Sequence, residues 1–445
     1  MFDAAIVGGG FAGLAAATAL ADAGARVLVL EARAQLGGRA TAFVDRVTGE
    51  LVDNGQHVLF GCYYETMRFL RRIGAADRVR VFPTLEVPFI DRRGRRSVLR
   101  CPPLPPPLHL LAGILDWDAL PWADRLSALR LARPLRQARR GVLPRDLTVS
   151  EWLAANRQGR RLCRWLWEPL AVAALNQSPA EAAAAPFVRV LAEMFGPDAS
   201  AAAIVLPNRP LHQMYAEPAR EYIAARGGEV RTGALARLVV QGNRVEAVDV
   251  RGERIPVPRA VAAVPWHGLR QLFGGGVPAP LEPVVKAADA MASKPIVTVN
   301  LWYDRQIMSE PFVGLPGRTM QWVFEKRLAF GEAASHVSLV SSAAGAIAAT
   351  PADDLVRQAA EEIAEALPGA RGAALVRGTV VREKRATFSL APGQPPRPPT
   401  ATPVAGLVLA GDWIDTGLPG TIESAVISGH RAALSIADRR SSGVE

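Results

Sequence analysis

The 445-residue sequence is poor in the residues that usually hold metals or form disulfides. Its three cysteines, Cys62, Cys101 and Cys163, lie far apart, and its six histidines are scattered. None of these residues stands at the spacing of a zinc or iron–sulfur ligand set, so we expect no metal site. An odd number of separated cysteines predicts free thiols in a reducing compartment.

Long apolar runs are also missing. None reaches the roughly 18 residues that a membrane-spanning helix needs. The N-terminus has no basic region before its first apolar strand, so no signal peptide is predicted. We therefore expect a cytoplasmic protein that is at most peripheral on the inner face of a membrane.

The net charge of +10 comes almost entirely from arginine, because the chain has only four lysines. The densest basic stretch, residues 125–140, holds six arginines without an acid or an aromatic residue. Nucleic-acid binding calls for basic and aromatic residues on one element, so we expect no nucleic-acid partner. An apolar, proline-rich stretch, residues 101–117, precedes the arginines. The pair predicts either a peripheral membrane contact or a solvated helix face beside a packed loop.

The first thirty residues have the pattern of a βαβ unit. Residues 4–7 read as an apolar strand, residues 14–23 as an alanine-rich helix that ends before Gly24, and residues 26–30 as a second strand. The glycine-rich sequence Gly8-Gly9-Gly10-Phe11-Ala12-Gly13 lies between the first strand and the helix. This order is the context in which such a motif binds a dinucleotide.

Each glycine of the motif has a physical task. Gly8 allows a tight turn, Gly10 lets the backbone approach a pyrophosphate, and Gly13 lets helix and strand pack closely. The pyrophosphate would then lie at the N-terminus of the helix, where N–H groups are unpaired. Glu31 follows the second strand, 18 residues after Gly13, and is placed to accept the hydroxyls of an adenosine ribose.

Two further stretches extend this site. Gly37, Gly38 and Arg39 follow the second strand, and an arginine there adds countercharge to the same pyrophosphate. Near the other end of the chain, residues 407–410 read as a short strand that leads to Gly411 and Asp412, and a helix opens at about Thr421.

The combination resembles flavoproteins of the amine oxidase and carotenoid desaturase type. The resemblance implies an α/β fold, in which a Rossmann-type FAD-binding domain is interleaved with an α+β substrate domain. It also implies that both chain ends hold one FAD, with Asp412 on the ribitol, the N–H groups near Thr421 and Ile422 on the flavin, and Ala236 on the adenine. The full set of expected FAD contacts is Gly8, Gly10, Phe11, Ala12, Gly13, Glu31, Ala32, Gly38, Arg39, Gly55, Gln56, His57, Ala236, Gly411, Asp412, Gly420, Thr421 and Ile422.

Five stretches resemble one subgroup more narrowly, the hydroxysqualene dehydroxylases. They are residues 53–57 (DNGQH), 166–179, 320–326, 382–392 and 411–429. One departure is Gly420, where the family pattern has alanine; we expect this change to be harmless. The resemblance implies reductive loss of an allylic hydroxyl from the C30 isoprenoid hydroxysqualene, on the way to squalene and hopanoids.

That chemistry needs a proton donor near the hydroxyl, exclusion of water and a long apolar tunnel. His57 is the first candidate for the donor, because it lies in the presumed flavin loop and has a side chain that titrates near neutrality. Glu168 and Tyr63 are alternatives. Trp165, Trp167 and Trp322 would either face a developing cation or pack in the core.

Other functions stay open at this level. The same flavin motifs suit a desaturase that removes hydrogen from a polyene such as phytoene. An amine oxidase, or a lipid carrier with a vestigial dinucleotide fold, fits less well. No second nucleotide motif is present, so the electrons come either directly from NAD(P)H or from a redox partner.

The predicted domain division has five segments. The FAD-binding domain takes residues 1–85, 205–275 and 385–445, and the substrate domain takes residues 86–204, mainly helical, and 276–384, mainly sheet. Helices dominate residues 108–194, where two capping boxes, Thr148 with Glu151 and Ser178 with Glu181, predict helix starts.

Overall fold

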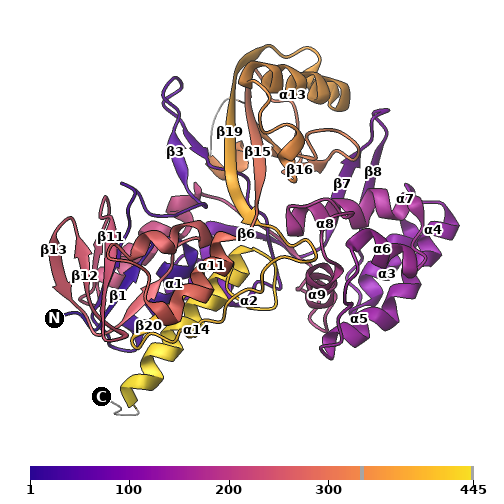
Figure 1. Ribbon diagram of the computed structural model, residues 1–445. Coiled ribbons are helices and arrows are strands. Elements are labelled where there is room, and N and C mark those ends of the chain that lie inside the picture. Colours follow the sequence, from indigo (N-terminus) through magenta and orange to yellow (C-terminus); the bar gives the residue numbers. More distant parts are fainter. Residues whose placement is uncertain (331–334, 442–445) are drawn as a thin grey trace.

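In the computed structural model, which describes residues 1–330 and 335–441, the chain is arranged as three regions. Figure 1 shows a parallel sheet with its helices at the lower left, an upper sheet at the top and a lobe of helices at the right. Both chain ends belong to the lower left region. The division into five sequence segments stays a prediction.

The parallel sheet is formed by segments from the whole length of the chain. Its order is β10-β2-β1-β14-β20, formed by Glu229–Arg231, Val27–Leu30, Ala4–Val7, Ala260–Ala262 and Leu407–Leu409. Strands β1 and β2 are buried on both faces, as is usual for parallel strands covered on two sides. The predicted βαβ unit is therefore confirmed.

Helices cover one face of this sheet and a small antiparallel sheet covers the other. On the first face Ile6 of β1 packs with α1 (Phe11–Asp22), α10 (Glu217–Ala224) and α14 (Ile422–Ser441). On the second face Val7 packs with α11 (Glu282–Asp289) and with the sheet β11-β12-β13. The three strands of that sheet are Ala236–Gln241, Arg244–Val250 and Glu253–Pro256.

The upper sheet has seven strands in the order β19-β15-β18-β17-β16-β7-β8. They are Leu375–Phe388, Ser293–Tyr303, Ser335–Ser341, Trp322–Glu325, Phe312–Gly314, Glu86–Ile90 and Arg96–Arg100. Residues 86–100 thus form a hairpin of this sheet, although they lie in the segment that we predicted to be mainly helical. On β15, Val297, Val299 and Leu301 pack against α13 (Ala352–Ala366), while the alternate residues face the opposite side.

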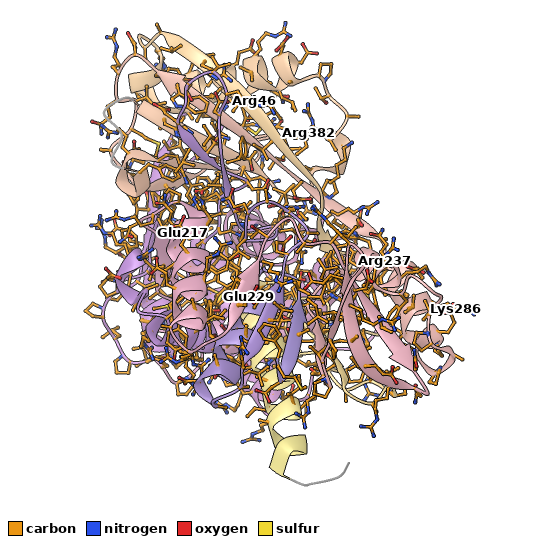
Figure 2. All side chains as sticks on the ribbon, turned by 90° about the vertical axis from the view of Figure 1, so that its left-hand side faces the viewer. Arg46, Glu217, Glu229, Arg237, Lys286 and Arg382 are labelled. Atoms are coloured by element: carbon orange, nitrogen blue, oxygen red, sulfur yellow. The ribbon has the colours of Figure 1, made fainter. Side chains whose placement is uncertain are left out.

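Short strands connect the two sheets. A hairpin of β3 (Ala42–Val44) and β4 (Leu51–Asp53) reaches β19, where Arg377 bonds Asp45 at 2.9 Å. Figure 2 labels Arg46, in the turn of this hairpin, and Arg382, which lies on β19. A second small sheet, β5-β9-β6, pairs Leu59–Phe60, Ile204–Pro207 and Val79–Phe82.

The helical lobe begins after β8. Its helices are α3 (Leu108–Asp116), α4 (Trp122–Ser127), η2 (Ala128–Leu131), α5 (Ala132–Arg139), α6 (Val149–Ala155), α7 (Arg160–Leu162), η3 (Cys163–Trp167), α8 (Glu168–Leu175) and α9 (Ala184–Met194). The capping box of Thr148 and Glu151 is confirmed at the start of α6. The second box is wrong: Ser178 opens a turn, and the next helix begins only at Ala184. Glu181 instead forms an ion pair with Lys294 of β15 at 2.8 Å.

Candidate functional site

The glycine-rich turn after β1 has the close packing that its sequence requires. Gly8 has φ of 117°, which favours glycine, and a Cβ atom there would overlap the carbonyl of Ala263 after β14. A Cβ atom on Gly13 would overlap the carbonyl of Gly8. The turn therefore holds helix α1 directly against the end of the sheet.

Gly10 lies in a different environment, facing an open cradle. A Cβ atom on Gly10 would come within 3.8 Å only of the Cα atom of Gly38, and one on Gly38 would lie 3.3 Å from the Cα atom of Gly10. Gly10 also caps α1 without a side-chain bond, so the first N–H groups of the helix have no acceptor within it. The backbones of Gly10 and Gly38 thus pack side by side, and the space beside Gly10 is otherwise open. The cradle that the two glycines form together fits a pyrophosphate, which needs room and N–H donors.

The expected adenosine contacts lie together at the end of β2. Both oxygens of the Glu31 carboxylate accept backbone hydrogen bonds, from Gly9 at 2.8 Å and from Arg33 at 2.9 Å. The backbone N–H of Ala234 donates to the carbonyl of Glu31 at 2.8 Å, and Ala236, the first residue of β11, follows two residues later. An ionised carboxylate has lone pairs for two further donors, so ribose hydroxyls fit this arrangement as well.

Arg39 and Asp412, which are 373 residues apart in the chain, form a two-pronged ion pair. Arg39 also donates to the carbonyl of Ala386 at 2.8 Å, and its guanidinium lies 5.5 Å from the ring centre of Trp266. Burial opposes the charged form of Arg39, but Asp412 outweighs this effect and raises the pKa of the guanidinium above its usual value. The pair joins the two chain ends at the edge where a dinucleotide would lie.

The Gly411–Asp412 turn is held rigidly. A Cβ atom on Gly411 would meet the indole of Trp413, which is fully buried and donates from Nε1 to the carbonyl of Val264 at 2.9 Å. A Cβ atom on Gly420 would lie 3.2 Å from a carboxylate oxygen of Asp412 and 3.0 Å from the ring of Phe388. A methyl group at this position would therefore pack tightly against Asp412 and Phe388, and the expectation that glycine is harmless here stays a prediction.

Helices α1 and α14 both begin at the carboxyl edge of the parallel sheet, because each follows a parallel strand. They pack so closely that a Cβ atom on Gly429 would overlap the carbonyl of Ala12. Gly429 is seven residues after Ile422, so α14 begins about 10 Å beyond this contact, at 1.5 Å per residue. The fold thus offers two separate helix N-termini, one for a pyrophosphate and one for the electron-rich edge of a flavin.

Residues 53–57 connect β4 and β5 and lie against the upper sheet, with Gly55 next to Thr298 of β15. The ammonium of Lys326 donates to Asp53 and to the Gln56 side-chain oxygen, both at 2.8 Å. The other oxygen of Asp53 accepts from the backbone of Leu211 at 3.0 Å. Both ends of the Lys326–Asp53 pair are buried, so this pair holds the loop without the screening that water gives.

The surroundings of His57 affect its suitability as a proton donor. Burial is the main cause that lowers its pKa to about 4, and the nearby charges of Lys326 and Arg39 add to this effect, while Asp53 opposes it. At pH 7 only about one molecule in a thousand would carry the imidazolium. His57 as a proton donor stays a prediction, and the form present at neutral pH is the neutral ring.

This shift makes a pH-dependent stability prediction. The pKa of His57 is about 6.5 in an unfolded chain and about 4 when folded. The unfolded state therefore binds the proton more readily, and stability falls as the pH drops from 6.5 toward 4. Between pH 7 and pH 5 we expect the loss in unfolding free energy to be about 2 kcal/mol smaller in His57→Gln than in the wild type. Urea unfolding at both pH values measures this difference, and equal losses would contradict the assignment.

The two alternative donors differ in position. The Tyr63 phenol is hydrogen-bonded to Thr421 at the start of α14, and burial raises its pKa, so the phenol keeps its proton at neutral pH. Glu168 begins α8 on the exposed surface of the helical lobe. Of the two, Tyr63 lies beside the expected flavin contacts.

The three tryptophans mainly serve packing. Trp165 packs against Trp117 and Phe89, and Trp167 donates to Gln158 at 3.0 Å inside the lobe. Trp322 is half-buried and contacts Phe89, with ring centres 5.9 Å apart. The expectation that Trp165 and Trp167 line a reaction site has no support from these contacts.

Three residues at the site carry roles that the sequence reasoning missed. Tyr215 stacks on Phe11 at 3.6 Å and donates to the carbonyl of Gly37 at 2.7 Å, which ties the two glycine elements together. Glu423, in the first turn of α14, accepts both backbone N–H bonds at the start of α2 (Tyr64–Arg72). For Lys326 a signal existed, since it is one of only four lysines and follows an apolar strand.

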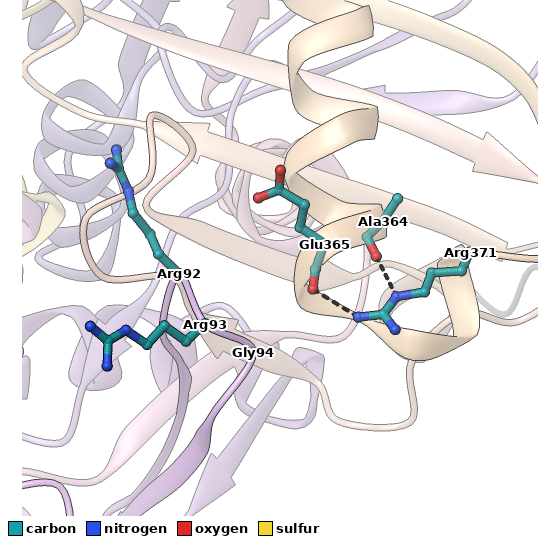
Figure 3. A pocket seen from close by; sticks show the side chains of 6 residues that line it. All are labelled: Arg92, Arg93, Gly94, Ala364, Glu365 and Arg371. Atoms are coloured by element: carbon teal, nitrogen blue, oxygen red, sulfur yellow. Dashed lines mark hydrogen bonds between the residues drawn. The ribbon is translucent and has the colours of Figure 1, made fainter.

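Two cavities in the described part of the chain differ in their relation to the site. One of about 30 Å³ is lined by Gln56 and Lys326, among others. Another of about 480 Å³ lies between the β7–β8 turn and the end of α13 (Figure 3). There Arg371 donates to the carbonyls of Ala364 and Glu365 at 3.0 and 3.3 Å, so it closes the C-terminus of α13.

The described residues form neither a metal ligand set nor a helix that could span a membrane. No three His, Cys, Asp or Glu side chains gather there as a metal ligand set would. Among the helices in residues 1–330 and 335–441, none combines the length and the apolar character that crossing a membrane requires.

Comparisons with known proteins match nearly the whole chain. The profile of the family described as flavin containing amine oxidoreductase matches residues 11–437. The chain is 30% identical over 436 residues to the hydroxysqualene dehydroxylase of Zymomonas mobilis, covering 96% of this chain and 97% of that one. It is 32% identical over 435 residues to the protein of the same name from Rhodopseudomonas palustris, covering 96% of each chain. The 15-cis-phytoene desaturase of Synechococcus elongatus is 26% identical over 468 residues, covering 99% of this chain and 98% of that one.

Solved structures share the fold at lower identity. An oxidoreductase from Methanosarcina mazei superimposes with a TM-score of 0.77 at 15% identity, covering 98% of this chain and 99% of that one. Cyclohexylamine oxidase from Brevibacterium oxydans gives a TM-score of 0.70 at 18% identity, covering 99% of each chain. These structures bear out the predicted fold class.

Proposed function

The chain belongs to the family of flavin-containing amine oxidoreductases, and from this membership we propose that it is an FAD-dependent reductase that converts hydroxysqualene to squalene. The chain is a flavin oxidoreductase of the group that includes the hydroxysqualene dehydroxylases. The observation that carries the substrate is the identity of 30–32% to relatives of that name over 96% of the chain. The desaturases are less similar to this chain, at 26% identity for the 15-cis-phytoene desaturase of Synechococcus elongatus. Their name indicates removal of hydrogen, which is the reverse of the reduction proposed here.

FAD as the cofactor is part of the proposal. Its pyrophosphate would lie in the cradle of Gly10 and Gly38, with Arg39 as countercharge, and its ribitol would bond Asp412. The N–H groups at the start of α14 would face the flavin edge. When bound and reduced, the flavin supplies a hydride. The offset of about 10 Å between the α1 contact and the start of α14 supports an extended dinucleotide rather than a single nucleotide.

The residues of this chain have three tasks in such a reaction. The net change is two electrons and two protons added to the allylic alcohol, with release of squalene and one water. One of these protons must reach the departing hydroxyl. The donors in this proposal are the Tyr63 phenol and the His57 ring, and His57 can donate only in the protonated form that burial makes rare at neutral pH. The Lys326–Asp53 pair holds the loop that carries His57. The apolar core of the helical lobe keeps water away.

An anaerobic single-turnover experiment tests the function. The flavin of the purified protein is reduced with light, hydroxysqualene is added, and flavin absorbance is followed while extracted lipid is analysed by mass. We expect reoxidation of the flavin with an equal amount of squalene. Squalene in place of hydroxysqualene is the substrate control, and free reduced FAD is the protein-free control.

Two results would contradict the proposal. If the flavin stays reduced in the presence of hydroxysqualene, the reductase function is wrong. Phytoene added to the oxidised protein then tests the desaturase alternative, in which flavin reduction accompanies loss of hydrogen from the polyene. If the protein carries no flavin and none can be reconstituted, the cofactor assignment fails as well.

A further inference from the structure

Exposed apolar side chains are concentrated on the helical lobe. Sixteen large apolar side chains are exposed in the described residues, and six of them fall between residues 104 and 142, less than a tenth of the chain. The six are Leu104, Leu108, Trp122, Leu126, Leu129 and Val142. Single exposed apolar residues are normal, but such a concentration marks an interaction surface.

Three of the six belong to one ordered stripe. The segments α4, η2 and α5 follow each other without a break, so residues 122–139 form one helical run. Three apolar residues are followed along the run by three arginines. Successive members are four, three, four, three and four residues apart, and this spacing keeps their side chains on one side of a helix. The stripe consists of Trp122, Leu126, Leu129, Arg133, Arg136 and Arg140, all of them exposed.

The opposite side of the same run packs into the lobe. Ser127, Leu131 and Ala138 are buried there, so the orientation of the run is determined by the core. The lobe forms the right-hand side of the molecule in Figure 1, and α4 lies at its outer edge. Because the buried residues lie on the opposite side of the run, the stripe faces out of the lobe.

Trp122 is held in place as an anchor. Its side chain is 66% exposed, and the Arg125 guanidinium lies 4.6 Å from the ring centre. Arg125 is itself fixed, because it donates to the carbonyls of Leu115 and Leu120 at 2.6 and 2.8 Å. A tryptophan presented in this way beside cations is typical of residues that lie at a membrane–water interface.

The basic half of the stripe carries charge that the protein does not neutralise. Within the described residues, no acidic side chain forms an ion pair with Arg133, Arg136 or Arg140, and residues 125–140 contain no acid. Guanidinium groups bind phosphate oxygens in a forked geometry, so the complement of this half is an array of phosphates.

We propose that this stripe docks the protein on the surface of a bilayer that contains anionic phospholipids. Trp122, Leu126 and Leu129 enter the headgroup region, and Arg133, Arg136 and Arg140 bind lipid phosphates. Tryptophan and leucine side chains next to a cluster of unpaired arginines are the pattern of helices that bind the surface of anionic membranes. The inference does not depend on the substrate proposed above, since it concerns residues outside the flavin site.

Vesicle flotation tests the proposal with the full-length, flavin-containing protein. Vesicles of phosphatidylcholine alone and of phosphatidylcholine with phosphatidylglycerol are compared at low and high salt. The apolar variant is Trp122→Ser with Leu126→Gln and Leu129→Gln, and its control is Leu235→Gln with Leu434→Gln, two other exposed leucines. The basic variant changes Arg133, Arg136 and Arg140 to Gln, and its control changes the exposed Arg220, Arg237 and Arg254 to Gln.

We expect the wild type and both controls to float with anionic vesicles, and less so at high salt. The basic variant should partition about a hundredfold less into anionic vesicles, since each arginine contributes about fivefold. The apolar variant should lose at least about tenfold on both kinds of vesicle. Flavin content and thermal unfolding of each variant check its folding, and Trp122→Ser alone replaces the triple variant if that one fails to fold.

Two outcomes would overturn the proposal. One is a wild type that does not float with anionic vesicles. The other is a control that loses as much binding as the stripe variant matched to it. If sedimentation then shows that the wild type self-associates through the stripe, and that the apolar variant does not, the surface is an interface between copies of the chain.

Discussion

Gly10→Val is expected to give a folded protein that purifies with less than about a tenth of the wild-type flavin. The backbone of Gly10 (φ −90°, ψ −172°) is extended and open to any residue, so valine brings little strain. Its branched side chain would instead occupy the open space beside Gly10 in the cradle that Gly10 and Gly38 form. Excluding the pyrophosphate removes charge-assisted hydrogen bonds of about 1.5–3 kcal/mol each, so the loss of two weakens binding at least a hundredfold. Flavin absorbance per protein after gel filtration measures the result.

Two matched variants separate cofactor loss from misfolding. Gly275→Val places the same side chain where no atom lies within 4 Å, and it should keep its flavin and its thermal stability. Asp412→Ala should lose flavin like Gly10→Val, because it removes the expected ribitol partner and leaves Arg39 without its carboxylate. Full flavin occupancy in either Gly10→Val or Asp412→Ala would count strongly against the site as placed here.

Asp53→Asn should have the largest effect on stability. It would leave the ammonium of Lys326 buried without a counter-ion, and breaking one side of a buried pair costs about 3–5 kcal/mol. The double variant Asp53→Asn with Lys326→Met removes both charges and should recover much of this loss. Urea unfolding of the two single variants and the double variant gives the coupling between the residues.

The exposed pair of Glu86 and Arg100 is the control for this cycle. Its atoms also lie 2.9 Å apart, but both side chains are about half exposed or more. Glu86→Gln should therefore cost less than about 1 kcal/mol. If Asp53→Asn costs no more than Glu86→Gln, the buried pair does not hold the loop of residues 53–57.

Local patterns predicted the parts of the fold that neighbouring residues determine. The buried strand, glycine turn and helix at the N-terminus were predictable because each depends on a short contiguous stretch. The same holds for the capping box at Thr148. The capping box at Ser178 failed because Glu181 pairs with Lys294, 113 residues away, and tertiary contacts override a weak local preference.

The sequence by itself determined that this chain has two glycine elements, an acid after the second strand and a strand–Gly–Asp–helix unit near its end. These features depend on residue type and short spacing, and they indicated a flavin dinucleotide. Only the tertiary structure decided that Arg39 meets Asp412 across 373 residues and that Lys326 meets Asp53 across 273. It also decided which side of residues 122–140 is left outside, because a helical period defines two faces but not which of them the core will cover.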